Sequence, residues 1–119
     1  MTRQPWTIHP DATVADARRA MREHGVRHLP VLVAGRLVGL VSERDLRLLR
    51  DDELTVEDAM STDVYVAEPG DPVDEVVERM AEHRYGSAVV LERGGRVAGI
   101  FTTIDGLQVL ADVLRRATA

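Results

Sequence analysis

The sequence contains no cysteine, so disulfides, thiol catalysis and zinc–thiolate sites are excluded. Lysine and asparagine are also missing, and all fifteen basic residues are arginine, which we attribute to the codon usage of a GC-rich prokaryotic genome. Aromatic residues make up only 3% of the 119 residues, whereas hydrophobic residues make up 45%. The chain can therefore bury a sizeable core, and that core must be mainly aliphatic.

Long apolar runs are missing as well. No stretch approaches the roughly 18 residues of a membrane-spanning helix, and the first residues lack the charged-then-apolar pattern of a secretory signal. The formal net charge of −5 disfavours a nucleic-acid partner, because phosphate contacts need a basic field. The four histidines show no metal-ligand spacing. We therefore expect a cytoplasmic protein with no metal and with neither a nucleic-acid nor a membrane partner.

What the sequence does contain is an internal repeat of about 40 residues. A shift of 59 residues, which becomes 60 after one extra residue in the second half, aligns identical residues. We define unit one as residues 7–49 and unit two as residues 65–114, and we assign residues 1–54 and 55–119 to two repeats of one module. The aligned pairs include Pro10 and Pro69, Val14 and Val73, Met21 and Met80, Val31 and Val90, Gly39 and Gly99, and Asp45 and Asp105.

Each unit is predicted to follow the order β-α-β-β-α. A short extended piece ending at a proline comes first, because the residue before proline avoids the helical region. Thr13 with Asp16 is expected to cap the next helix of unit one, and Asp71 before Pro72 that of unit two. Two nearly all-apolar strands then form a hairpin and are expected to be buried on both faces. The predicted strands are 28–33 and 37–42 in unit one, and 87–92 and 96–102 in unit two.

A repeated S/T-x-x-D motif, Ser42 to Asp45 and Thr102 to Asp105, follows the second strand of each hairpin. One interpretation is a capping box at the start of a helix. The other is a ligand site, because a carboxylate one turn into a helix can accept hydrogen bonds from two neighbouring hydroxyls, as a ribose offers. The two roles are compatible. Thr55 to Asp58 is interpreted as a cap only.

The last predicted helix carries two apolar stripes. One stripe is expected to pack on the core of the chain, and the other is expected to form an interface between two copies, since exposed apolar patches mark interfaces. The stripes are Ile104, Leu107, Ala111 and Leu114, and Val109 with Val113.

The order and duplication of these motifs resemble a tandem pair of CBS domains, the domain named from cystathionine β-synthase. The segments that carry the resemblance are "GVRHLPVL…GRLVGLVSERDL", "YGSAVVLERGGRVAGIFTTIDGL" and the "VEDAM" before unit two, and it extends over residues 7 to 114. The resemblance implies an α/β fold of two repeats packed with pseudo-two-fold symmetry around two clefts. It also implies a disc-like homodimer and adenosine ligands such as AMP, ADP, ATP, S-adenosylmethionine or NAD.

The resemblance assigns roles to particular residues. Asp45 and Asp105 would bind ribose, and Ser42 and Thr102 would lie near ribose or phosphate. Unit one departs from the family because "TRQPW" stands where a "V-x-D-x-M" lead-in is usual. The further candidates for phosphate contact are Arg27, His28 and Arg44, with a solvated charge as the alternative for Arg27 and a salt bridge as that for Arg44. Gly86 and Ser87 stand at the places in unit two that match Arg27 and His28. Trp6 and Tyr85 could pack on an adenine, with packing in the core or at an interface as the alternative.

The function predicted from these features is a regulatory sensor that binds an adenosine ligand, changes conformation and acts on a regulated protein in trans. The alternative is a ligand-free dimerisation or protein-interaction module. Enzyme activity is not expected, because the sequence offers no nucleophilic cysteine and no Ser-His-Asp set on a strand-turn elbow. No cofactor is required for either function.

Overall fold

The computed structural model describes residues 1–118. Two β-hairpins form the centre of the fold, β2–β3 in unit one and β5–β6 in unit two. The elements in chain order are β1 (Thr2–Arg3), α1 (Val14–His24), β2 (His28–Val33), β3 (Arg36–Ser42), α2 (Glu43–Arg47), α3 (Val56–Ala59), β4 (Val66–Ala67), α4 (Val73–His83), β5 (Ser87–Leu91), β6 (Val97–Thr102) and α5 (Thr103–Thr118).

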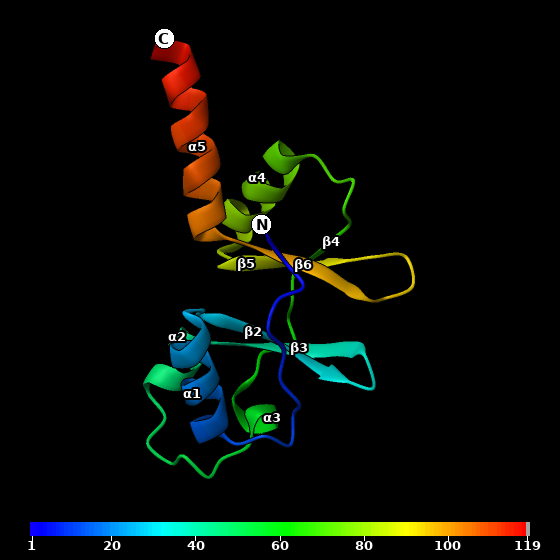
Figure 1. Cartoon of the computed structure of the whole chain (residues 1–119), viewed down its shortest axis with the longest axis vertical. Coiled ribbons are helices and arrows are strands. Elements are labelled where there is room, and N and C mark those ends of the chain that lie inside the picture. Colours follow the sequence, from blue (N-terminus) through cyan, green and yellow to red (C-terminus); the bar gives the residue numbers. More distant parts are fainter. Residues whose placement is uncertain (119) are drawn as a thin grey trace.

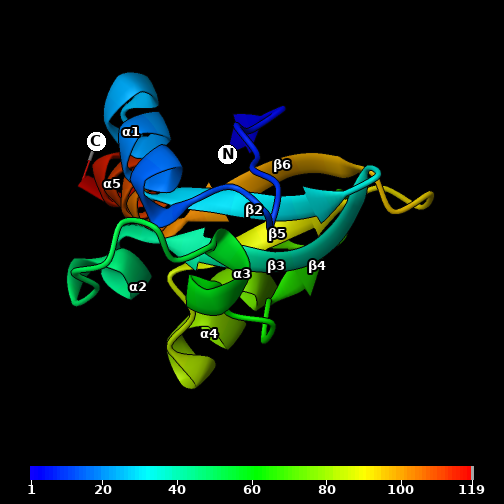
Figure 2. The ribbon, with the colours of Figure 1, turned by 90° about the horizontal axis from the view of Figure 1, so that it is seen from below.

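The two hairpins lie one above the other in the middle of the molecule (Figure 1). Helices α1 and α3 cover the outer face of the β2–β3 sheet, and α4 covers the outer face of the sheet ordered β1-β6-β5-β4. The view from below shows the strands of the two sheets stacked, with their hairpin turns at the same end (Figure 2). The extended piece expected in unit one is reduced to a single parallel bridge between Ile8 and Val31, whereas β4 pairs with β5 over two residues.

Aliphatic side chains fill the core, as the composition predicts. Residues 87–90 of β5 are all buried, and because alternate strand residues point to opposite faces, this strand is buried on both faces. The core of unit one contains Val14, Ala17, Met21, Leu29, Val31, Val41, Leu46 and Val56, and that of unit two contains Ala67, Val76, Met80, Ala88 and Phe101.

The helix ends show which local signals the structure uses. Thr13 and Asp16 form the expected reciprocal capping box at α1. The expected cap at α4 is wrong: Pro72 occupies the N-cap position without a side-chain hydrogen bond, and the Asp71 carboxylate instead accepts from the Glu68 N–H at 2.9 Å. Both α1 and α4 end in a left-handed residue, and unit two uses Arg84 (φ 58°) where unit one has Gly25 (φ 63°).

The segment that precedes each unit pairs with a strand of the other unit and so joins the two units. We call residues 1–4 and 60–63 the leading segments. Thr2 pairs with Ile100 of β6, and Ser61 pairs with Leu40 of β3, so each leading segment extends the sheet of the opposite unit. The division of the repeats between residues 54 and 55 stays a prediction, and the packing of the leading segments crosses it.

Gly39 and Gly99 make this pairing possible. A Cβ on Gly39 would lie 2.9 Å from the Ser61 carbonyl oxygen, and one on Gly99 would lie 2.8 Å from that of Thr2. The leading segments therefore approach the strand backbone closely at these two glycines. The first residue, Met1, lies against Gly99 as Met60 lies against Gly39, so "TRQPW" follows the position of the lead-in methionine.

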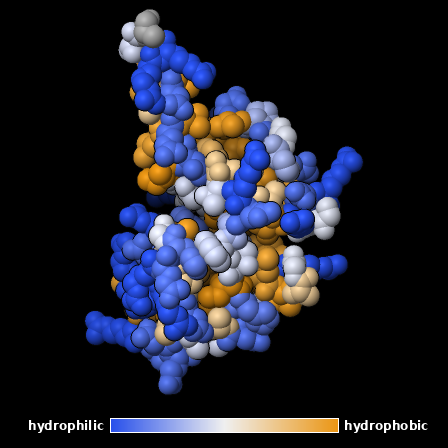
Figure 3. Space-filling model, in the orientation of Figure 1, coloured by the Kyte–Doolittle hydropathy of each residue, from blue (hydrophilic) through white to orange (hydrophobic). Residues whose placement is uncertain are grey.

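Helix α5 projects beyond the two sheets, and the expectation that one of its stripes packs on the core is wrong. None of its residues is buried, and Leu107, Leu110 and Leu114 are each at least half exposed. Figure 3 shows apolar side chains gathered on the part of α5 nearest the sheets, with a hydrophilic far end. Only the first turns of this helix reach the rest of the chain, because it extends past the end of α4 (Figure 1).

Candidate functional site

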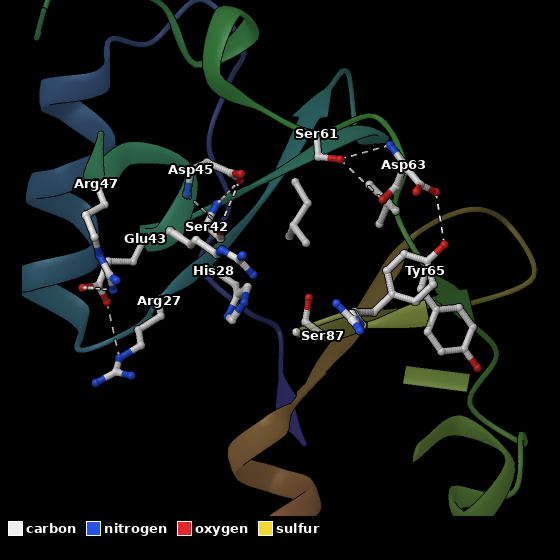
Figure 4. A pocket seen from close by; sticks show the side chains of 16 residues that line it. Arg27, His28, Ser42, Glu43, Asp45, Arg47, Ser61, Asp63, Tyr65 and Ser87 are labelled. Carbon is white, nitrogen blue, oxygen red and sulfur yellow. Dashed lines mark hydrogen bonds and ion pairs between the residues drawn. The ribbon is translucent and has the colours of Figure 1, made fainter. Parts of the chain in front are cut away.

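A cleft of about 410 Å³ lies between the two units, beside the junction of β3 and α2. Unit one contributes its wall from the start of β2 and from residues 42–47, and the opposite wall comes from residues 61–65 and 84–87. Figure 4 shows Ser42 and Asp45 on one side of the cleft, with Asp63 and Tyr65 on the other. Five of the predicted site residues line it, namely Arg27, His28, Ser42, Arg44 and Asp45.

The other two predicted residues, Thr102 and Asp105, lie at the junction of β6 and α5 and do not line this cleft. Their arrangement repeats that of unit one: the Asp105 carboxylate accepts from the Thr102 N–H at 2.8 Å. The ammonium group of Met1 lies 3.9 Å from Asp105 Oδ1. The structure therefore separates the seven residues into two places related by the repeat.

Only one carboxylate oxygen of Asp45 takes part in the helix cap. Its Oδ2 accepts from the Ser42 N–H and from the Ser42 hydroxyl, both at 2.9 Å, while the Asp45 N–H donates to Ser42 Oγ at 3.1 Å. Oδ1 receives no hydrogen bond from residues 1–118. The capping interpretation is confirmed, and the second oxygen of this half-buried side chain has no hydrogen-bond partner among residues 1–118.

The charges around the cleft are unevenly paired. Arg27 and Arg47 both approach the Glu43 carboxylate, with N···O distances of 3.4 and 3.9 Å. Arg44 and Arg84 make no ion pair within residues 1–118. The cleft therefore holds two guanidinium groups without a carboxylate partner, and one of them comes from unit two.

His28 is a poor cation in this setting. Burial lowers its pKa below the ordinary value of 6.5, an effect that the nearby Arg27 reinforces and that Asp45 and Glu43 oppose. A Cβ on Gly86 would lie 3.3 Å from His28 Nε2, so the ring packs closely against the opposite unit. The side chain is therefore mainly neutral at pH 7 and can offer a ligand a hydrogen bond but little charge.

The wall contributed by unit two contains Tyr85, which the sequence analysis considered as an adenine contact, and it adds Asp63, Tyr65 and Ser87, which the sequence analysis did not name as ligand contacts. The Tyr85 hydroxyl donates to Asp63 Oδ1 at 3.2 Å, which raises the pKa of Tyr85, and its ring centroid lies 5.4 Å from that of Tyr65. Ser87 is only 4% exposed, and its hydroxyl has no hydrogen-bond partner among the described residues. The repeat offered a signal, because Tyr65 aligns with Trp6, and each lies in the short extended piece that precedes the first helix of its unit.

Comparison with known proteins identifies the module. The family model described as "CBS domain" matches residues 1–51 and again residues 56–112. This chain belongs to the CBS-domain family. The CBS pair of protein MJ0100, solved in complex with 5′-methylthioadenosine and S-adenosyl-L-methionine, is 27% identical, with a TM-score of 0.87 over 94% of this chain and 92% of that chain. CBSX2, solved in complex with AMP, is 25% identical, with a TM-score of 0.83 over 95% and 93%.

These matches confirm the predicted family and the α/β fold of two β-α-β-β-α CBS repeats. Inosine-5′-monophosphate dehydrogenase of Korarchaeum cryptofilum (strain OPF8) is 35% identical over 99 residues, which are 83% of this chain and 21% of the enzyme. The chain thus spans about a fifth of that enzyme, and the match is confined to the CBS part. Within residues 1–118, no helix is long and apolar enough to cross a membrane, and no three histidine or acidic side chains are grouped to hold a metal ion.

Proposed function

We propose that this CBS pair is a sensor that binds a phosphate-bearing adenosine ligand in the cleft at Asp45. The observation that carries the proposal is the convergence of unsatisfied polar groups from both units: Asp45 Oδ1 on one wall and the buried Ser87 hydroxyl on the other. Buried polar groups without partners are uncommon in native proteins. The ligands bound by MJ0100 and CBSX2 support an adenosine ligand, and the AMP bound by CBSX2 supports a phosphate group on it.

The geometry suggests a role for each part of the cleft. Asp45 accepts the ribose hydroxyls, Tyr65 and Tyr85 offer aromatic faces to the adenine, and Arg44 and Arg84 contribute positive charge for phosphate. Ser42, Arg27 and His28 are proposed to lie near the phosphate as well. Thr102 and Asp105 are proposed to serve a second adenosine position at the β6–α5 junction.

Regulation follows from where the ligand would sit. Residues 61–65 both line the cleft and connect the Ser61 pairing on β3 to β4 of unit two. A ligand that fills the cleft therefore contacts both units and the segment between them. If it binds one relative orientation of the units better than another, it shifts the population toward that orientation, and a regulated protein in trans can read the change.

We expect AMP to bind more tightly than adenosine, and the difference between them to shrink as salt rises, because a contact between phosphate and exposed arginines is screened. Isothermal titration calorimetry at low and high salt measures both affinities. A thermal-shift panel of AMP, ADP, ATP, S-adenosylmethionine and NADH then ranks the ligands, since a ligand at 100 times its Kd adds about 2.7 kcal/mol. Equal affinity for adenosine and AMP at all salt concentrations would overturn the phosphate part of the proposal. A panel without any stabilising ligand would overturn the sensor itself.

A second candidate function is a dimerisation module that needs no ligand, and the exposed apolar face of α5 favours it. Ile104, Leu107, Leu110, Val113 and Leu114 are each half exposed or more. Light scattering is expected to give a mass of twice the 13.2 kDa chain, and Leu110→Glu should shift it toward the monomer, while Gln108→Glu on the same helix serves as a matched charge control. A stable monomer at high micromolar concentration would contradict dimerisation. A dimer that no adenosine ligand stabilises would favour this second function.

A further inference from the structure

One carboxylate, that of Glu43, is the ion-pair partner of both Arg27 and Arg47 at the exposed edge of the cleft. Glu43 Oε2 lies 3.4 Å from Arg27 Nε, and its Oε1 lies 3.9 Å from Arg47. The backbone holds this arrangement, because the Glu43 N–H donates to the Arg27 carbonyl at 2.8 Å and fixes the start of α2 beside the start of β2. Figure 4 shows the three side chains together at one edge of the cleft.

The ion pairs of this cluster are weak enough for a phosphate group to replace Glu43. The side chains of Arg27, Arg47 and Glu43 are 76%, 70% and 50% exposed, and ion pairs at such exposure contribute little to stability. A phosphate group offers more negative charge than a carboxylate and several acceptor oxygens, so it can replace Glu43 as the partner of a guanidinium group. Glu43 itself repels a phosphate that enters the cleft beside it.

The same three residues also line a second groove, of about 550 Å³, between α1 and α2. Arg18 and Arg22 of α1 form its other side. The cluster is therefore a wall with the ligand cleft on one face and a basic groove on the other, and a change of partner on the cleft side alters the charge that the groove presents.

We propose that Glu43 makes the affinity of the cleft depend on the charge of the ligand. Without a phosphate, Glu43 pairs with Arg27 and Arg47, and a phosphate group replaces Glu43 as the partner of these arginines. The inference rests on the proposed function, since it needs an adenosine ligand in the cleft at Asp45. It adds that Glu43, which contacts no adenosine group in this account, sets the preference between phosphorylated and unphosphorylated ligands. Phosphate binding would thereby also change the charge of the groove between α1 and α2.

The Glu43→Gln variant tests the inference by titration calorimetry with AMP and with adenosine. We expect the affinity for AMP to rise about three- to tenfold and the affinity for adenosine to stay within about twofold, because a weak competitor and a repelling charge are removed. The substitution leaves the capping pair of Ser42 and Asp45 in place, so folding should be unaffected. Glu78→Gln, on the exposed side of α4, makes the same change in net charge far from the cleft and should change neither affinity.

A second arm separates competition from a general charge effect. In a background of Arg27→Gln and Arg47→Gln, the added Glu43→Gln should improve AMP binding less than it does in the wild type, because no guanidinium remains to be released. An AMP affinity that is unchanged or lowered by Glu43→Gln, with adenosine still bound, would overturn the inference alone. If the wild-type protein binds neither AMP nor adenosine, the proposed function fails, and the inference fails with it.

Discussion

We expect the Gly39→Ala variant to lose about 3 kcal/mol of unfolding free energy, a large fraction of what holds a domain of this size together. Gly39 lies where the second leading segment crosses β3. The added Cβ would lie 2.6 Å from Met60 Sδ and 2.9 Å from the Ser61 carbonyl oxygen. The methionine side chain can move aside, but the backbone oxygen can retreat only if the pairing of Ser61 with Leu40 is broken.

Breaking that pairing adds to the steric cost. Leu40 and Ser61 exchange two backbone hydrogen bonds of 2.8 and 2.9 Å, and each such bond contributes about 1 kcal/mol. Because residues 61–65 also form a wall of the ligand cleft, the variant should lose affinity for AMP together with stability. Urea denaturation measures the first effect and calorimetry the second.

The chain supplies matched glycine controls. Gly70→Ala should be close to neutral, because a Cβ there meets no atom within 4 Å and the backbone is not left-handed. Gly99→Ala should behave like Gly39→Ala, since its Cβ would lie 2.8 Å from the Thr2 carbonyl oxygen. A Gly39→Ala variant within about 0.5 kcal/mol of the wild type would show that the leading segment is not held as described.

The Asp45→Asn variant should bind AMP roughly 10- to 150-fold more weakly than the wild type. An asparagine keeps the shape of the side chain and much of its capping ability, so the ligand-free protein should change little in stability. It loses the charged acceptor that Asp45 Oδ1 offers to ribose, and a hydrogen bond to a charged group contributes about 1.5–3 kcal/mol. The loss in affinity follows at 1.4 kcal/mol per factor of ten.

Asp58→Asn is the control that separates a ligand contact from a helix cap. Thr55 and Asp58 form the same capping box as Ser42 and Asp45, but they begin α3 and do not line the cleft. This variant should affect stability as Asp45→Asn does and leave AMP affinity unchanged. Asp105→Asn tests the second position in the same way. If Asp45→Asn and Asp105→Asn both bind AMP as the wild type does, the two motifs are caps and the sensor hypothesis fails in this form.

The parts of the fold that sequence reasoning predicted depend on contacts close in the chain. The Thr13–Asp16 box and the two hairpins are each set by a few neighbouring residues, and the repeat doubled the information for the hairpins. Asp71 shows the limit of such reasoning, because its carboxylate can accept from the Glu68 N–H as well as cap α4, and the structure uses the former.

The sequence predicted the wall of the candidate site that unit one contributes, but not most of the opposite wall. Ser42 and Asp45 form a local motif that the sequence shows directly, whereas Asp63 lies in the cleft wall because the second leading segment crosses to β3. That crossing is a contact between distant segments, and its only trace in the sequence is a glycine within an apolar strand. The exposure of α5 was missed for a similar reason, since its apolar stripes do not reveal that the helix extends beyond the sheets.

The central claim is that an adenosine ligand binds between the units at Asp45, and a ¹H–¹⁵N NMR titration with AMP tests it most directly. We predict saturable shifts at the backbone amides of residues 42–45, 61–65 and 84–87, which form the two walls of the cleft. Asp45→Asn should weaken these shifts without moving the spectrum of the ligand-free protein elsewhere. A spectrum that does not respond to AMP, or saturable shifts that leave these three segments unchanged, would contradict the account.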